Sequence, residues 1–108
     1  MVNYEELSKT ISSLTSGESD EIAKMATVAC EFHWSDDRFD WTGFYRVVSP
    51  ELLKIGPYQG RHGCLLIPFS NGVCGAAAKT GTTQLVPNVL LYPNHIACSN
   101  TTRSELVI

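Results

Sequence analysis

Three of the four cysteines in this chain of 108 residues lie within one third of its length, so thiol chemistry is the first possibility to consider. Cys64 opens an apolar run typical of a strand, Cys74 lies in a Gly-Val-Cys-Gly run where a helix should begin, and Cys98 follows a Pro-Asn turn. The three thiols lie in three different local contexts, so a redox site would form only if the fold brings them close together.

The reactivity of each thiol depends on how readily it becomes a thiolate. Backbone N–H groups at a helix start would lower the pKa of Cys74, although a closely packed helix start explains the same run equally well. Cys98 follows His95 by three residues in an irregular segment, where a histidinium could stabilise a thiolate; chance proximity is the competing explanation. Cys64 is either a core residue or a resolving thiol, if its Cα lies within about 6 Å of a partner's Cα.

A zinc site is the alternative hypothesis for the same part of the chain, because zinc accepts a donor set of two histidines and two cysteines such as His62, Cys64, His95 and Cys98. Structural zinc sites usually begin with two ligands separated by about two to four residues on a tight turn. Here only one residue separates His62 from Cys64, so the spacing favours redox chemistry. We expect no metal and no other cofactor.

Composition excludes several other classes of function. The net charge of −3 and the lack of a basic stripe argue against nucleic acid as a partner. No apolar run approaches the length of a membrane span, and the N-terminus does not read as a signal peptide. We therefore expect the protein in the cytoplasm or also the nucleus, where four cysteines are kept reduced at rest.

The elements that must position these thiols follow from local patterns. Apolar spacing of three or four residues predicts helices over 3–16 and from Asp20 to His33, with Cys30 on the apolar side of the second and assigned to packing. Strands are predicted from Trp41 to Val48, from Leu52 to Ile55, from Cys64 to Pro68, over 84–86 and from Glu105. A tight return is predicted over 56–60 and a helical turn over 88–91. A short helix is predicted over 72–79, with Gly81 placed to end it. This order predicts one α+β domain over residues 1–108, with helices packed on an antiparallel sheet.

Aromatic residues on the first predicted strand suggest a wall for a small ligand. Trp41 and Tyr45 share one face of that strand, and Gly43 lies between them. A glycine inside a strand often marks a close approach of another group to the backbone. Ordinary core aromatics beside a bulge remain the alternative interpretation.

Several motifs in this order resemble the free methionine-(R)-sulfoxide reductases, which are small GAF-domain enzymes. The match covers the chain from about Trp41 to Ile108. It includes Trp-Thr-Gly-Phe-Tyr at 41–45, Gly-Pro-Tyr-Gln-Gly at 56–60, the runs at 64–68, 72–75 and 86–89, Tyr-Pro-Asn-His-Ile-Ala-Cys at 92–98 and Ser-Glu-Leu-Val at 104–107.

The resemblance implies a GAF-like fold and reduction of free methionine sulfoxide. Cys98 would attack the sulfoxide sulfur and become a sulfenic acid, Cys64 or Cys74 would condense with it to a disulfide, and thioredoxin would reduce that disulfide. Trp41 and Tyr45 would wall the pocket around the methyl-sulfoxide end, and Glu105 would engage the substrate as a proton donor. Family members are often homodimers, which is therefore a further expectation.

Two departures from the family pattern qualify this expectation. Ser99 stands where the family usually has Asp after His-Ile-Ala-Cys, and the sequence ends before the strand with two further aspartates and the closing helix that the family carries. The resemblance thus predicts a GAF-like domain that is incomplete at its C-terminus. A non-catalytic GAF-type module that binds a small ligand or a partner is the alternative function.

Overall fold

The computed structural model describes residues 1–93, 98 and 101–108. The chain divides into two compact units: residues 1–44 with 56–61, and residues 45–55 with 62–108. Strands β1 (Trp41–Ser49) and β2 (Leu52–Gly60) each contribute one part to each unit. Helices and antiparallel strands are both present, which confirms the predicted α+β class.

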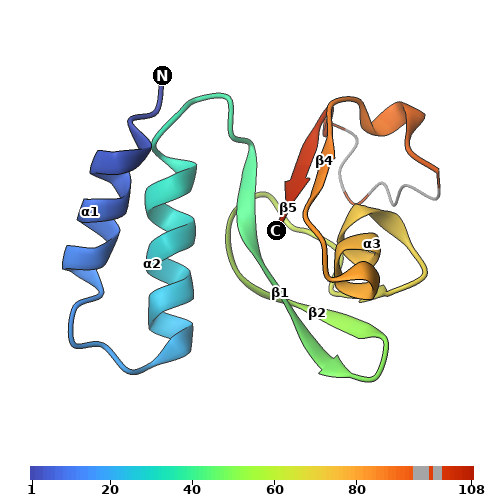
Figure 1. Ribbon diagram of the computed structural model, residues 1–108, viewed down its shortest axis with the longest axis horizontal. Helices are drawn as coiled ribbons and strands as arrows, with labels where there is room; N and C mark the ends of the chain where they lie inside the picture. Colours follow the sequence, from blue (N-terminus) through green and yellow to red (C-terminus); the bar gives the residue numbers. More distant parts are fainter. Residues whose placement is uncertain (94–97, 99–100) are drawn as a thin grey trace. The chain divides into compact units, whose positions relative to one another are not determined.

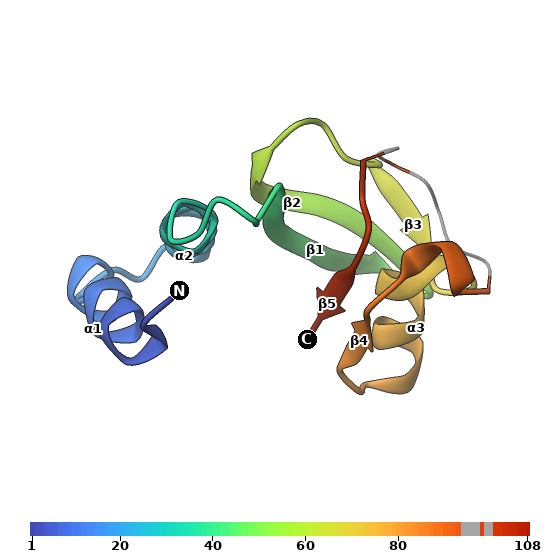
Figure 2. The same ribbon diagram turned by 90° about the horizontal axis from the view of Figure 1, so that it is seen from above.

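The first unit begins with two helices that pack against each other, α1 (Tyr4–Leu14) and α2 (Glu21–His33) (Figures 1 and 2). Both have an N-cap side chain that accepts a backbone N–H: Asn3 from Glu6 at 3.1 Å, and Asp20 from Ile22 at 2.9 Å. These caps explain why the helices begin where the sequence predicts.

The apolar side predicted for α2 is only partly buried. Ala29 is buried and Cys30 is half-buried, whereas Ile22 is 63% exposed. The first turn of the helix therefore lies largely uncovered. Spacing alone identifies the apolar stripe of a helix but does not tell how far along the helix a neighbouring element covers it.

Strand β2 continues through the segment for which the sequence predicts a tight return, so that prediction was wrong. The backbone N–H of Ile55 donates to the carbonyl of Leu65 at 3.0 Å, on the side of β2 that faces β3 (Leu66–Pro68). Alternation along a strand directs the nitrogen of Pro57 to that same side, beyond the end of β3. Proline therefore removes no hydrogen bond from the ladder, and β1, β2 and β3 form one sheet in that order.

Gly43 of β1 is the place of close approach that the sequence predicts. A Cβ atom there would lie 2.9 Å from the Cα of Tyr58 and 2.9 Å from Cη2 of Trp41, and closer still to the Cβ of Tyr58. The Trp41 and Tyr58 rings are stacked, with centroids 5.2 Å apart. Only glycine lets the tryptophan ring lie over the backbone at this point.

Replacing Gly43 with alanine should lower the free energy of unfolding by about 2–3 kcal/mol, because the added methyl group must displace strand backbone. Urea unfolding measures the loss. Gly17→Ala is the control: its φ of 78° is unfavourable for alanine, but nothing lies within 4 Å of the added atom, so about 1 kcal/mol is expected. An equal or smaller loss for Gly43→Ala would contradict the packing argument.

The second unit contains α3 (Gly72–Thr80), β4 (Gln84–Val86), the 3-10 turn η1 (Val89–Leu91) and β5 (Glu105–Val107). Helix α3 contacts β3, β4 and β5, and β4 pairs with β5 in an antiparallel register that places Val86 opposite Glu105 (Figures 1 and 2). Val73, Val86 and Val89 form its core, with Tyr92 and Val107 packed against them.

Two details of this unit bear on the sequence predictions. Gly81 ends α3 in the left-handed conformation, with φ of 68°, as predicted. Cys64, however, does not open the third strand, because β3 begins only at Leu66. The thiol therefore lies on the irregular segment between β2 and β3.

Candidate active site

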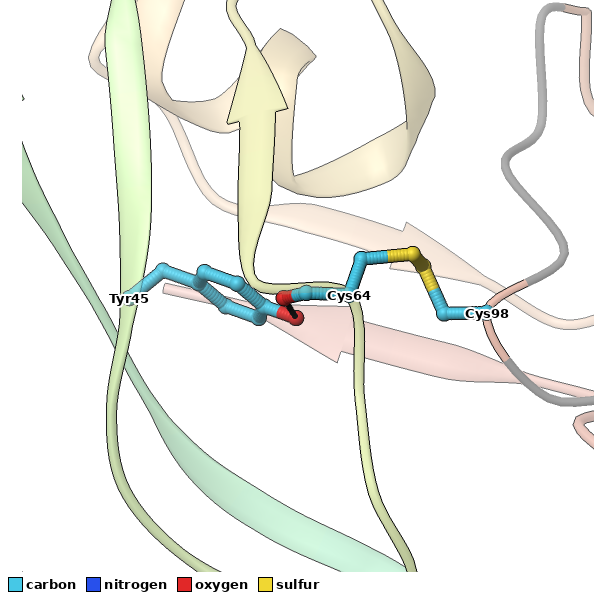
Figure 3. The surroundings of a disulfide bond; sticks show 3 residues. All are labelled: Tyr45, Cys64 and Cys98. Atoms are coloured by element: carbon cyan, nitrogen blue, oxygen red, sulfur yellow. Dashed lines mark hydrogen bonds between the residues drawn. A yellow bond between two sulfur atoms is a disulfide. The ribbon is translucent and has the colours of Figure 1, made fainter.

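Cys64 and Cys98 are joined by a disulfide bond that spans a sequence separation of 34 residues (Figure 3). Their Cα atoms lie 5.3 Å apart, within the distance that a disulfide requires. Both residues are half-buried. The second unit thus contains a pair of thiols that can be oxidised and reduced together.

Two hydrogen bonds position Cys64 although it lies outside regular structure. The Tyr45 hydroxyl donates to the backbone carbonyl of Cys64 at 2.8 Å, and Figure 3 shows the ring reaching from β1 toward that carbonyl. The next carbonyl, that of Leu65, accepts the N–H of Ile55 in β2. The cysteine is therefore held from two neighbouring strands.

Described residues before and after Cys98 in the sequence form hydrogen bonds with Val89 of η1. Before Cys98, the Tyr92 N–H donates to the carbonyl of Val89 at 3.1 Å and the Tyr92 ring packs on the core. After Cys98, the carbonyl of Arg103 accepts the Val89 N–H at 2.9 Å. Val89 is 1% exposed, so both hydrogen bonds lie at the core. His95 and Ser99 lie outside the described residues, and the predicted effect of His95 on Cys98 stays a prediction.

Cys74 lies in the first turn of α3 and is not part of the disulfide. Burial raises the pKa of the Cys74 thiol to about 11, and the negative charge of Glu105 on β5 raises it further. The lowered pKa that the helix start suggests was therefore wrong. Desolvation of a thiolate inside the unit outweighs the favourable helix terminus.

We expect Cys74 of the reduced protein to react with iodoacetamide roughly a hundredfold more slowly than an ordinary thiol at pH 8, because little of it is thiolate. Glu105→Gln should lower its pKa and speed alkylation by less than about tenfold, since burial is the larger cause. Mass spectrometry of the alkylated peptides measures both effects. Glu51→Gln, at an exposed turn, is the matched control.

The same thiol should affect stability at alkaline pH. A pKa raised from 9.0 to about 11 favours the folded state fully below about pH 9, and this contribution is lost as the pH rises through 11. Fast alkylation of Cys74 in the folded protein at pH 8 would contradict a half-buried thiol with a raised pKa.

The predicted substrate-binding residues fall into both units. Tyr45 and the half-buried Glu105 belong to the unit that holds the disulfide, whereas Trp41 belongs to the other unit, where it stacks on Tyr58. The role of each toward a substrate stays a prediction. Sequence reasoning missed the hydrogen bond of the Tyr45 hydroxyl, because a partner 19 residues away leaves no local signal.

Neither a metal centre nor a membrane span is found in the described part of the chain. Among residues 1–93, 98 and 101–108, no three His, Cys, Asp or Glu side chains are grouped so that they could hold a metal ion. No helix in those ranges combines the length and the apolar character needed to cross a membrane.

Comparison with known proteins relates this geometry to a family, although no protein-family model matches the chain. A free methionine-R-sulfoxide reductase of Saccharomyces cerevisiae is 49% identical over 71 residues, which are 64% of this chain and 39% of the yeast protein. The structure of a free methionine-R-sulfoxide reductase from Neisseria meningitidis in complex with its substrate superposes with a TM-score of 0.91 at 38% identity, covering 97% of this chain and 63% of that one.

The reduced form of the Staphylococcus aureus fRMsr superposes with a TM-score of 0.92 at 35% identity, over 100% of this chain and 70% of that one. The fold is that of a GAF domain, as predicted. This chain belongs to the free methionine-R-sulfoxide reductase family. It spans less than two thirds of the length of its first curated relatives.

Proposed function

We propose that this protein reduces free methionine-(R)-sulfoxide to methionine by thiol chemistry. The observation that carries the proposal is the Cys64–Cys98 disulfide in a chain of this family. The related reductase of Neisseria meningitidis has been solved in complex with its substrate, which supports a small free substrate for the family fold. The disulfide corresponds to the oxidised product of one turnover.

The reaction balances with the two thiols and one substrate molecule. The Cys98 thiolate attacks the sulfoxide sulfur and a proton reaches the oxygen. The oxygen then passes to the Cys98 sulfur while its bond to the methionine sulfur and the transient sulfur–sulfur bond break, so that methionine leaves and Cys98 becomes a sulfenic acid. The Cys64 thiol then displaces the sulfenic hydroxyl, which forms the disulfide and releases water. Each turnover thus moves two electrons from the protein to the substrate.

An external dithiol must restore the two thiols, and thioredoxin supplies that chemistry in a reducing compartment such as the cytoplasm. One thioredoxin thiolate attacks the disulfide, and its second thiol releases the mixed disulfide. The half-buried position of both cysteines supports access by such a reductant.

We assign Tyr45 to the wall of the substrate pocket and Glu105 to protonation of the sulfoxide oxygen; the contact of Trp41 with substrate stays an expectation from the resemblance. The assignment rests on the family resemblance and on side-chain chemistry: aromatic faces suit a methyl sulfide, and a carboxylic acid can donate the proton that the leaving oxygen requires. Cys74 remains protonated at neutral pH because burial raises its pKa, which favours Cys64 for resolution.

A coupled assay tests the function. The protein is incubated with thioredoxin, thioredoxin reductase and NADPH, and each epimer of free methionine sulfoxide is added in turn. We expect NADPH oxidation and methionine formation with the free R epimer, and neither with the S epimer nor with a peptide that contains methionine sulfoxide. Binding of the R epimer without turnover would instead support the non-catalytic GAF module.

A further inference from the structure

We infer that Tyr45 is a positioning residue for disulfide closure, because its hydroxyl hydrogen-bonds to the backbone of the cysteine that must reach the Cys98 sulfenic acid. The inference rests on the proposed function and adds a role to the Tyr45 ring predicted to contact substrate. The bond joins the Tyr45 hydroxyl to the Cys64 carbonyl at 2.8 Å, within one compact unit that also contains Cys98 (Figure 3).

The need for such a restraint follows from the local structure around Cys64. The strand β2 ends at Gly60 and β3 begins at Leu66, so Cys64 is on a connecting segment without a strand ladder of its own. Apart from the disulfide, the interactions described for its backbone are the hydrogen bond from Tyr45 and the neighbouring bond between Ile55 and Leu65. In the reduced protein the disulfide is open, and these two hydrogen bonds still restrain the backbone that carries the Cys64 thiol.

Closure requires the two sulfurs to meet while the Cα atoms are about as close as they are in the oxidised form, 5.3 Å. A thiol held near its target reacts faster than one that must search, because its positional freedom is lost before the reaction. Without the hydroxyl, the Cys64 carbonyl would turn to water and the segment would sample positions in which the sulfurs are too far apart.

The hydrogen bond goes to the Cys64 carbonyl rather than to either sulfur, so its loss should change the geometry of Cys64. Tyr45 would therefore act after oxygen transfer. The expected signature is a separation of two rates: release of methionine in the first turnover, and formation of the disulfide that follows it.

Tyr45→Phe removes only the hydroxyl and keeps the ring that is predicted to contact substrate. The reduced variant is mixed with free methionine-(R)-sulfoxide in the absence of thioredoxin and quenched at intervals. Methionine, free thiols and dimedone-trapped sulfenic acid are then counted. We expect closure to slow about three- to tenfold, the range of a typical hydrogen bond, and the Cys98 sulfenic acid to accumulate. Tyr4→Phe, on α1, is the matched control and should close at the wild-type rate.

A second oxidant separates this inference from the proposed function. Hydrogen peroxide converts the Cys98 thiolate to the sulfenic acid and releases hydroxide, so closure can be followed without any methionine sulfoxide. If the sulfoxide is not reduced but Tyr45→Phe still slows closure after peroxide, the positioning role stands and the proposed substrate falls. Closure at the wild-type rate after either oxidant would overturn the positioning role.

A side chain that keeps a hydrogen-bond donor at position 45 shows whether slower closure comes from the lost hydrogen bond or from a general disturbance of the structure. 4-Aminophenylalanine at position 45 places an amine at the far end of the ring and should restore closure to within about twofold of the wild-type rate. Closure as slow as in Tyr45→Phe would overturn the inference. All rates are measured well below the thermal midpoint of the least stable reduced variant.

Discussion

Replacement of Cys98 by serine is expected to lower turnover of free methionine-(R)-sulfoxide by at least about a thousandfold, because a serine hydroxyl cannot take up the oxygen as the Cys98 thiolate does when it becomes a sulfenic acid. Cys98 forms a disulfide with Cys64, and it is the last residue of the Tyr-Pro-Asn-His-Ile-Ala-Cys motif that resembles the family. The thioredoxin-coupled assay measures the loss, with released methionine counted directly by chromatography.

Two further variants show which step has failed. Cys64→Ser should release about one equivalent of methionine per protein molecule and then stop, because oxygen transfer precedes resolution. Cys30→Ser is the matched control, since this half-buried thiol lies on α2 in the other unit and should leave turnover unchanged. Turnover above about a tenth of wild type in Cys98→Ser would move the nucleophile to another thiol, Cys74 being the nearest candidate in sequence.

Reduction of the Cys64–Cys98 disulfide is expected to lower the free energy of unfolding by about 3–4 kcal/mol. The bond closes a loop with a sequence separation of 34 residues. In the chain-entropy model, closing a loop of this length in the unfolded state gives a stabilisation of about this size. Urea unfolding of the oxidised and the reduced protein, followed by the fluorescence of the tryptophans, measures the difference.

The matched comparison is again between cysteine variants. Cys30→Ser should retain the full difference between oxidised and reduced protein, whereas Cys64→Ser should show no dependence on reductant. A difference below about 1 kcal/mol in the wild type would contradict the expectation, because it would mean that the unfolded chain gains little freedom when the bond opens.

The expected difference in stability between the oxidised and the reduced protein also affects the catalytic cycle. Each turnover would convert a less constrained reduced protein to a more constrained oxidised one, and thioredoxin would have to reverse this gain. Cys64 lies outside the strands, on the connection between β2 and β3, whereas α3, β4 and β5 are held by the valine core. The cycle therefore should leave the elements of the second unit in place.

Local signals in the sequence predicted most of the elements. Apolar spacing placed α1 and α2, and Gly81 placed the end of α3, because these features depend on neighbours within about four residues. The error at β2 has a physical cause. Gly56 and Pro57 usually mark a turn, but an amide that faces no partner strand can be replaced by proline without loss.

What the sequence by itself determined is the set of elements, the presence of three thiols in one third of the chain, and the likeness to a reductase family, since all of these are written in local composition and motif order. Only the tertiary structure decided that Cys64 is the partner of Cys98, that Cys74 is half-buried within reach of the charge of Glu105, and that the Tyr45 hydroxyl reaches the Cys64 backbone. These relations join residues 19 to 34 positions apart, and folding rather than spacing along the chain sets such distances.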